Sequence, residues 1–256
     1  MFTSKIFENR VEEILHAHPF IHREIIGTSR CGVAIQSLVI GSGEKSVLIN
    51  AAHHANEWIT SLILLRFIEE YAKKIPENIT LHCIPLVNPD GVDLLDPTWK
   101  ANICGVDLNS NYPAGWEIAR ERKFANGFSA PGARDFVGEK PLCEPESCAM
   151  AAYTIFHEPH ITLSLHTQGE EIYWRYMDFN PPGAEELARR FAKVSGYKNV
   201  DVPDENSHAG YRDWFIARFN RPGFTIECGL GENPLPLSQF DDMYEKVKKI
   251  LWEAMV

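Results

Sequence analysis

Apolar residues recur along this chain at two spacings, one typical of helices and the other of buried strands. The final segment gives the clearest helical pattern, because apolar residues follow Phe240 at i+3, i+4, i+7, i+10 and i+11. Helices are predicted at residues 5–17, 58–74, 144–157, 183–195, 209–219 and 240–251. Buried strands are predicted at residues 22–28, 33–40, 46–52, 79–87, 161–165 and 223–227.

Strands that alternate with helices in this order are typical of an α/β fold. They indicate a mixed, mostly parallel sheet with helices on both faces. Residues 92–145 are rich in Asn, Gly, Pro and aromatic side chains, and we assign them to long loops, which often carry function. Because the sequence contains no repeat, low-complexity tract or linker, residues 1–256 are interpreted as a single domain.

Charge and composition narrow the choice of partners. The 256 residues carry a formal net charge of −10, which argues against nucleic acid or an anionic membrane as the main partner. The longest aliphatic run, 62–65, is too short to cross a bilayer, and the charged N-terminal segment lacks a secretory signal, so we expect a cytoplasmic protein. The six cysteines show no redox or zinc-ribbon spacing, and only Cys143 and Cys148 invite a local disulfide.

A candidate metal motif follows the predicted strand at 46–52. His54-x-x-Glu57 offers an imidazole nitrogen and a carboxylate oxygen, both of which zinc accepts, although the motif is weak by itself. A catalytic zinc usually has three protein ligands and one open position, so a third ligand is expected further along. His166, which closes the strand 161–165, is the candidate, and a hydrogen-bonded core histidine is the alternative.

Two carboxylates extend this set of residues. Glu227 ends the strand at 223–227, where a buried carboxylate is costly unless it is paired or functional. Asp107 is a candidate to orient a metal-bound histidine by accepting its second ring proton. His54, His166 and Glu227 each lie at the carboxyl end of a predicted strand, where sheets of this class form their sites.

In order and spacing, these motifs resemble those of the zinc carboxypeptidase (funnelin) family. The resemblance is carried by His54-x-x-Glu57, Gly-Val-Asp107-Leu-Asn109, the strand-end His166 and Thr-Ile-Glu227. It covers about residues 46–232. It implies an eight-stranded mixed sheet, one zinc ion per chain held by His54, Glu57 and His166, and Glu227 as the catalytic acid and base.

Within that family, the chain looks most like the bacterial γ-D-glutamyl-L-diamino acid endopeptidases. The closer resemblance lies in Trp99-Lys-Ala-Asn-Ile, residues 105–116, His-Thr-Gln168-Gly-Glu-Glu-Ile-Tyr-Trp174 and Asp213-Trp-Phe. Those enzymes cut the amide bond between γ-D-glutamate and diaminopimelate in peptidoglycan stem peptides. The resemblance therefore implies a small peptide as partner. It makes Gln168 and Trp174 candidates for substrate binding, although aromatics after a strand are more often core residues.

The chain also departs from the family pattern. Carboxypeptidases read Asn-Arg where this chain has Asn109-Ser110, so their clamp for a terminal carboxylate is incomplete. This difference argues against plain exopeptidase activity, while Asn109 stays a candidate for substrate binding. Lys100 aligns with the family's oxyanion-stabilising arginine, and we expect it to supply positive charge there without the fork geometry of a guanidinium.

The segment before Asp213 carries further candidates. The family's mobile tyrosine has no clear counterpart, because a gap-free alignment places Glu205 there, with His208 and Tyr211 nearby. His208 is a candidate for substrate binding. Arg212 takes the position that sets side-chain preference in the digestive carboxypeptidases, and a cation there suits an acidic substrate group. A surface arginine paired with a neighbouring Glu or Asp is an equally weighted alternative.

Two other functions stay open at this point. One is a zinc-dependent deacylase or amidohydrolase of small N-acyl amino acids, against which the long loops of 92–145 argue mildly. The other is a catalytically silent domain that binds muropeptides. Such a domain is expected to lose a ligand or the base, whereas all four of these residues are present here.

Overall fold

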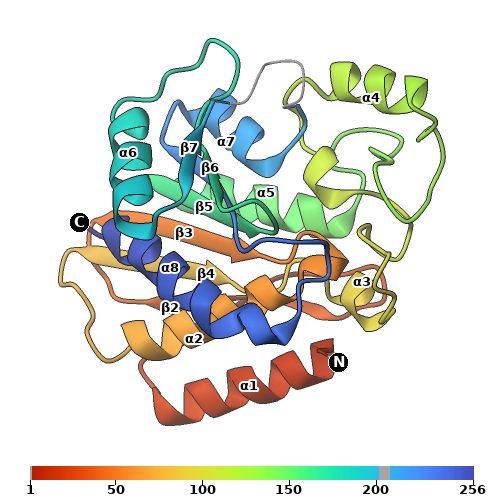
Figure 1. The fold of residues 1–256 in the computed structure, drawn as a ribbon. Coiled ribbons are helices and arrows are strands. Elements are labelled where there is room, and N and C mark those ends of the chain that lie inside the picture. The colour runs from red at the N-terminus through yellow and green to blue at the C-terminus, as the bar shows by residue number, and fades with distance from the viewer. Residues whose placement is uncertain (1, 202–207) are drawn as a thin grey trace.

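Within the described residues, 2–201 and 208–256, eight strands of this computed structural model form one sheet (Figure 1). The order across the sheet is β1-β2-β4-β3-β5-β8-β6-β7. The strands are β1 (His22–Thr28), β2 (Ala34–Ile40), β3 (Lys45–Ala51), β4 (Ile79–Ile84), β5 (Ile161–His166), β6 (Glu171–Tyr173), β7 (Lys198–Val200) and β8 (Gly223–Glu227). Among these described strands, four neighbouring pairs are parallel and three are antiparallel, which confirms the mixed, mostly parallel sheet.

Helices cover both faces of this sheet, as the alternation of elements predicted. The helices are α1 (Ser4–Ala17), α2 (Ile59–Tyr71), α3 (Pro89–Asp93), α4 (Trp116–Ala125), α5 (Pro145–His157), α6 (Ala184–Ser195), α7 (Tyr211–Phe219) and α8 (Phe240–Glu253). Apolar side chains of α1, α2, α6 and α8 pack in one core cluster, and those of α5 and α7 pack in a second cluster with other strand residues (Figure 1). In the described part of the chain, the short 3-10 helices are η1 (Ala55–Glu57), η2 (Leu108–Ser110) and η4 (Leu237–Gln239).

Local sequence explains the ends and faces of these helices. The side chain of Thr3 accepts a hydrogen bond from the backbone N–H of Ile6 and so caps the start of α1. In α8, Met243, Tyr244, Val247, Ile250 and Leu251 of the predicted apolar face are buried, and Phe240 at its start is half-buried. No described helix combines the length and the apolar character needed to cross a membrane.

The structure differs from the sequence analysis at four points. Residues 92–145 are not all loop, because they contain α4, whose polar sequence buries only Trp116 and Ala119. The strands β6 and β7 were not predicted, since three residues are too few for an alternating pattern to show. The strand expected at 79–87 ends at Ile84. All six cysteines are free thiols, so Cys143 and Cys148 do not form the local disulfide that their spacing invited.

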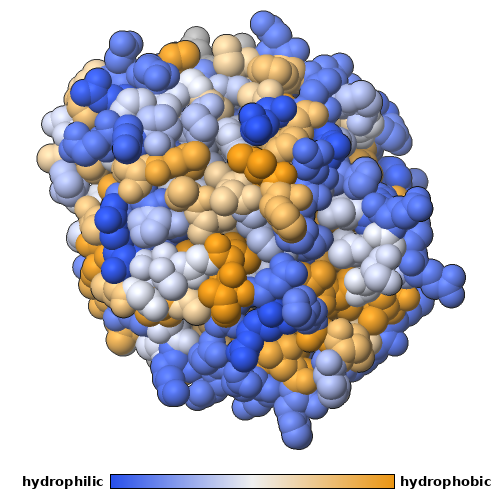
Figure 2. All heavy atoms as spheres, turned by 180° about the vertical axis from the view of Figure 1, so that it is seen from behind, coloured by the Kyte–Doolittle hydropathy of each residue, from blue (hydrophilic) through white to orange (hydrophobic). Residues whose placement is uncertain are grey.

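The surface is polar with separate apolar patches, as expected for a chain with 35 acidic and 25 basic residues. Figure 2 shows such patches among hydrophilic side chains on the face opposite to the view of Figure 1. More important for function, the parallel strands β3, β5 and β8 end at the same edge of the sheet. Ala51 lies beside Leu165, and His166 lies beside Glu227. The segments that follow these strand ends therefore meet in space.

Candidate metal centre and active site

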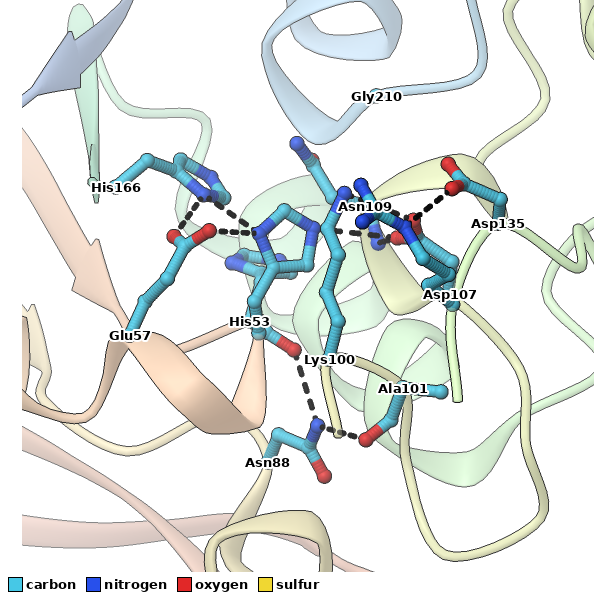
Figure 3. A network of polar contacts seen from close by, with 12 residues as sticks. His53, Glu57, Asn88, Lys100, Ala101, Asp107, Asn109, Asp135, His166 and Gly210 are labelled. Carbon is cyan, nitrogen blue, oxygen red and sulfur yellow. Dashed lines mark hydrogen bonds and ion pairs between the residues drawn. The ribbon is translucent and has the colours of Figure 1, made fainter. Parts of the chain in front are cut away.

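Three side chains converge where β3 and β5 end. The chain leaves β3 at Ala51, and the single turn of η1 brings Glu57 back beside His54. His166 is the last residue of β5. Nδ1 of His54 lies 2.8 Å from Oε1 of Glu57, and Nδ1 of His166 lies 2.9 Å from Oε2 of the same carboxylate (Figure 3). One ligand atom from each residue lies within 4.8 Å of the other two, so these three could hold a metal ion.

Burial and mutual charge shape this cluster. All three side chains are buried, and the two Nδ1 atoms are 3.2 Å apart. Burial opposes ionisation of Glu57, but the neighbouring His54 and His166 outweigh it and hold the pKa of Glu57 well below its usual range. Burial lowers the pKa of His166. The backbone N–H of Thr167 also donates to Oε2 of Glu57 at 3.2 Å, which fixes the carboxylate in place.

Asp107 connects this cluster to Lys100. Its Oδ1 lies 3.2 Å from Nε2 of His54, and its Oδ2 lies 3.2 Å from Nζ of Lys100 (Figure 3). Burial alone would raise the pKa of Asp107, but the charges of Lys100 and His54 keep it well below its usual value. The ionised Asp107 can accept a hydrogen bond from Nε2 of His54, and the tautomer with its proton on Nε2 is the one that leaves Nδ1 free to bind a metal ion.

The donor set fits zinc. Two imidazole nitrogens and one carboxylate, turned toward one another and held away from bulk water, match the ligand set that catalytic zinc centres use. With its proton on Nε2, toward Asp107, His54 would present a nitrogen lone pair to a metal ion. Because the pKa of Glu57 is lowered, its carboxyl group is ionised and supplies negative charge that attracts a divalent cation.

Glu227 lies opposite this centre. It is the last residue of β8, directly beside His166 in the parallel register, and it lines the open space next to the cluster. Burial raises the pKa of Glu227 to about 8, and the charge of Glu57 adds to the shift. A carboxyl group whose pKa lies near neutrality is well matched to accepting and returning a proton.

Two cavities lie next to the metal cluster and share part of their lining. One has a volume of about 380 Å³, and the other has a volume of about 680 Å³. They share His54, Lys100, Tyr173 and Glu227 as lining residues, so the candidate centre lies where the cavities meet. This arrangement offers room for a substrate on both sides of the reacting group.

Four of the predicted substrate-binding residues line these cavities. Asn109, His208 and Arg212 line the smaller cavity, and Gln168 lines the larger one. Oδ1 of Asn109 accepts the backbone N–H of Tyr211 at 3.0 Å and thereby positions the start of α7. Arg212 is buried and pairs with Asp213 at 2.5 Å, so it is not the surface arginine of the alternative interpretation, although it does have an acidic neighbour.

Trp174 is the exception among the predicted pocket residues. It is only 9% exposed, belongs to the main core cluster, and lines neither cavity. Its neighbour Tyr173 lines both cavities instead and was missed from the sequence. The three residues of β6 are too few for the alternation of a strand to show, so the sequence pattern contained no signal for Tyr173.

His53, beside the metal motif in the sequence, and Glu205 are two further positions of interest. His53 is fully buried, and its Nε2 lies 2.9 Å from the hydroxyl of Tyr112, as expected for a structural histidine. Glu205, the position aligned with the family's mobile tyrosine, lies outside the described residues.

The eight-stranded sheet and this donor set define a class, the zinc peptidases built on the carboxypeptidase fold. The model of the zinc carboxypeptidase family matches residues 8–249, and the chain belongs to that family. It is therefore a peptidase, as the sequence predicted.

Individual relatives agree with this assignment. The uncharacterized protein YqgT of Bacillus subtilis (strain 168) is 38% identical over 294 residues, covering 100% of this chain and 77% of that protein. Gamma-D-glutamyl-L-diamino acid endopeptidase 1 of Lysinibacillus sphaericus is 38% identical over 275 residues, covering 93% of this chain and 68% of that protein. The structure of bovine thrombin-activatable fibrinolysis inhibitor has a TM-score of 0.81 at 19% identity, covers 98% of this chain and 95% of that chain, and supports the fold alone.

Proposed function

We propose that this protein is a zinc peptidase that hydrolyses the amide bond between γ-D-glutamate and a diamino acid, such as diaminopimelate, in peptidoglycan stem peptides. The observation that carries the proposal is the candidate centre of His54, Glu57 and His166, which lies between two cavities and beside Glu227. The substrate is inferred from the 38% identity to the endopeptidase of Lysinibacillus sphaericus, which extends over 93% of this chain.

The loop at Asn109-Ser110 supports cleavage inside a peptide rather than at its C-terminus. Ser110 has no cationic side chain to clamp a terminal carboxylate, and the neutral amide of Asn109 does not replace a guanidinium in that role. Space on both sides of the centre also suits a substrate that continues in both directions. In the proposed binding mode, the leaving diamino acid lies in the smaller cavity with Arg212, and the glutamyl side lies in the larger cavity.

In this proposal, His54, Glu57 and His166 hold one zinc ion per chain, and Asp107 orients His54. Zinc in such a site makes a hydroxide-like nucleophile available at neutral pH by lowering the pKa of the water it binds toward about 7. Glu227 accepts a proton from the attacking water, and the positive charge of Lys100 stabilises the oxyanion that forms on the carbonyl oxygen. Glu227 then delivers that proton to the amine nitrogen as the carbon–nitrogen bond breaks.

The test is an assay of purified protein with a γ-D-glutamyl-diaminopimelate tripeptide beside a set of N-acyl amino acids. We expect cleavage of the tripeptide at the γ-glutamyl bond, about one zinc per chain by metal analysis, and loss of activity with a chelator that added zinc restores. Cleavage of the N-acyl amino acids alone would favour the deacylase. Metal binding without hydrolysis of either substrate would favour the silent muropeptide-binding domain.

The remaining expectations from the sequence belong to the same proposal. One catalytic domain spans residues 1–256, and the protein works in the cytoplasm. Six free thiols are consistent with a reducing compartment, where disulfides are rare. Cell fractionation with an antibody against the protein would test the location.

A further inference from the structure

Arg134 lines the larger cavity but has no role in the reaction described above. It shares that cavity with Lys100, Glu57 and Glu227, the groups that surround the reacting carbonyl in the proposed mechanism. Its side chain is 64% exposed, so the guanidinium can meet a ligand that enters from solvent. The loop that carries Arg134 lies between α4 and α5.

Backbone hydrogen bonds fix this loop beside the candidate centre. The carbonyl of Ala133 accepts the N–H groups of Lys100 at 2.8 Å and Ala101 at 3.0 Å. The carbonyl of Phe136 accepts the N–H of Asp107 at 2.8 Å. Arg134 is thus carried by a segment that is tied at both ends to the residues flanking the metal cluster, and Figure 3 shows its neighbour Asp135 beside Asp107.

Asp135 pairs with Arg134 through Nε alone and leaves the two terminal nitrogens of the guanidinium available. Nε of Arg134 donates to Oδ2 of Asp135 at 2.8 Å, and Lys123 pairs with Oδ1 of the same buried carboxylate. Lys100 pairs with Asp107 in the same region. These three cations pair with two carboxylates, and further carboxyl groups of Glu57, Glu227 and Glu232 line the same cavity. Nη1 and Nη2 of Arg134 make no hydrogen bond within the described part of the chain, and they are the natural donors for an anion.

The backbone at this position is also unusual. Asp135 has a φ of +67°, a left-handed conformation that residues other than glycine rarely adopt. Strained residues of this kind persist where surrounding contacts fix them, and they cluster at sites that bind ligands. Here the two cations that pair with Asp135 supply such contacts, so the direction of Arg134 is set before any ligand arrives.

The proposed substrate presents a carboxylate that the guanidinium of Arg134 could bind. In a γ-glutamyl amide, the free α-carboxylate is separated from the scissile carbonyl carbon by four carbon–carbon bonds, within a reach of about 5 Å given bond lengths of about 1.5 Å. It lies on the acyl side of the bond, which the proposed binding mode assigns to the larger cavity. A guanidinium binds a carboxylate through two parallel hydrogen bonds, which a neutral carboxamide cannot match.

We infer that Arg134 is a specificity-determining residue that binds the free α-carboxylate of the glutamyl group, and so selects a γ-linked acid over the same peptide amidated at that position. This inference rests on the proposed function. It adds a requirement that the proposed function does not contain, because hydrolysis of the γ-glutamyl bond alone needs no free carboxylate.

The experiment compares two peptides that differ only in this group, one with the D-glutamate α-carboxylate and one with the α-carboxamide. We expect the zinc-loaded protein to cleave the acid with a kcat/KM at least 10-fold higher than the amide. Arg134→Gln should lower kcat/KM for the acid about 10- to 100-fold, the loss expected for a charged hydrogen bond, and change that for the amide less than about 3-fold. Arg134→Lys should recover part of the activity on the acid.

Arg189→Gln is the matched control, because Arg189 is similarly exposed at 59%, pairs with Glu186, and lines neither cavity. It should leave both substrates unaffected, and zinc content and melting temperature should stay unchanged in all variants. Equal rates on the two peptides, or equal losses on both in Arg134→Gln, would overturn the inference while the proposed function stands. If the unmodified protein cleaves neither peptide, the proposed function fails and this inference fails with it.

Discussion

The carboxyl group of Glu227 combines two properties that a proton carrier in hydrolysis needs. Its position beside His166 brings it next to the candidate metal cluster, and burial raises its pKa to about 8. We predict that Glu227→Gln lowers kcat by about 10²- to 10⁴-fold, because the amide keeps the shape of the side chain and cannot accept the proton. Zinc content should not change, since Glu227 is not among the three converging ligands.

The measurement is steady-state hydrolysis of the γ-glutamyl tripeptide, with metal analysis of the same preparation. Glu232→Gln is a suitable control, because Glu232 lines the same cavity but is exposed and lies outside the metal cluster. Near-normal turnover by Glu227→Gln would show that another group carries the proton.

In the proposed zinc site, Asp107 does not touch the metal but acts on it through the ring of His54. Oδ1 of Asp107 lies 3.2 Å from Nε2 of His54, so the charge of this carboxylate would set the tautomer and the basicity of that ligand. We predict that Asp107→Asn weakens zinc binding about 10- to 100-fold, as measured by competition with a chromophoric chelator. Asp96→Asn, an exposed substitution outside both cavities, should bind zinc as the parent protein does. Unchanged zinc affinity in Asp107→Asn would remove the orienting role.

At the scale of the elements, Gly43 controls how β2, β3 and β4 meet. A Cβ atom at this position would lie 1.9 Å from the carbonyl carbon of Asn78 and 2.1 Å from the nitrogen of Ile79. These are backbone atoms at the start of β4, so the turn and the strand would have to separate. We predict that Gly43→Ala destabilises the protein by about 1–3 kcal/mol, the usual cost of overpacking, and lowers the melting temperature by several degrees.

Thermal unfolding followed by circular dichroism provides the check. Gly132→Ala is the control, because the nearest atom to its added Cβ is the Ala130 oxygen at 3.9 Å. A melting temperature for Gly43→Ala equal to that of the control would mean that the turn adjusts without cost.

The sequence predicted the long elements well, for a physical reason. The helices α1, α6 and α8 and the strand β5 each bury one side or all of their apolar residues, so periodicity reports them directly. The helix α4 was not predicted because it buries few residues, and β6 and β7 were not predicted because a pattern cannot show in three residues. Pairing partners far away in sequence stabilise such short strands, and local sequence does not contain that information.

The same distinction applies to the candidate site. The structure brings together His54, Glu57 and His166, which strand ends and spacing had pointed to. Tyr173 and Arg134, in contrast, enter the cavities from a short strand and an irregular loop. Their positions depend on how β6 and the loop before α5 pack. Residues at the ends of long strands or in spaced motifs were therefore predictable, and residues on a three-residue strand or an unpatterned loop were not.

At the scale of the whole molecule, the residues proposed to react and the residues proposed to select the substrate lie on different parts of the fold. His166 and Glu227 lie on parallel strands at the centre of the sheet, and such rigid elements hold reacting groups precisely. Arg134 and Gln168 lie on connections at the rim of the larger cavity, where sequence changes leave the core packing intact. On this view, substrate preference can change among relatives without disturbing the metal cluster.

Stability of the whole molecule should depend on pH through a buried group away from the active site. His82 on β4 is buried, and its Nδ1 lies 2.8 Å from the hydroxyl of Tyr153. Burial, together with the nearby His157 and against the opposing charge of Glu24, lowers the pKa of His82 to about 4. The unfolded chain, with an ordinary histidine pKa of about 6.5, therefore binds more protons than the folded chain between these two pH values.

Because the folded pKa lies below the unfolded one, the stability is fully present above pH 6.5 and falls as the pH drops toward 4. The loss from His82 amounts to about 3 kcal/mol at most, at about 1.4 kcal/mol for each pH unit of the shift. We predict that His82→Gln, which retains a donor for Tyr153, flattens the dependence of unfolding free energy on pH in this window. Urea denaturation at a series of pH values measures it, with the exposed His16→Gln as control. An unchanged slope in His82→Gln would assign the acid sensitivity to other groups.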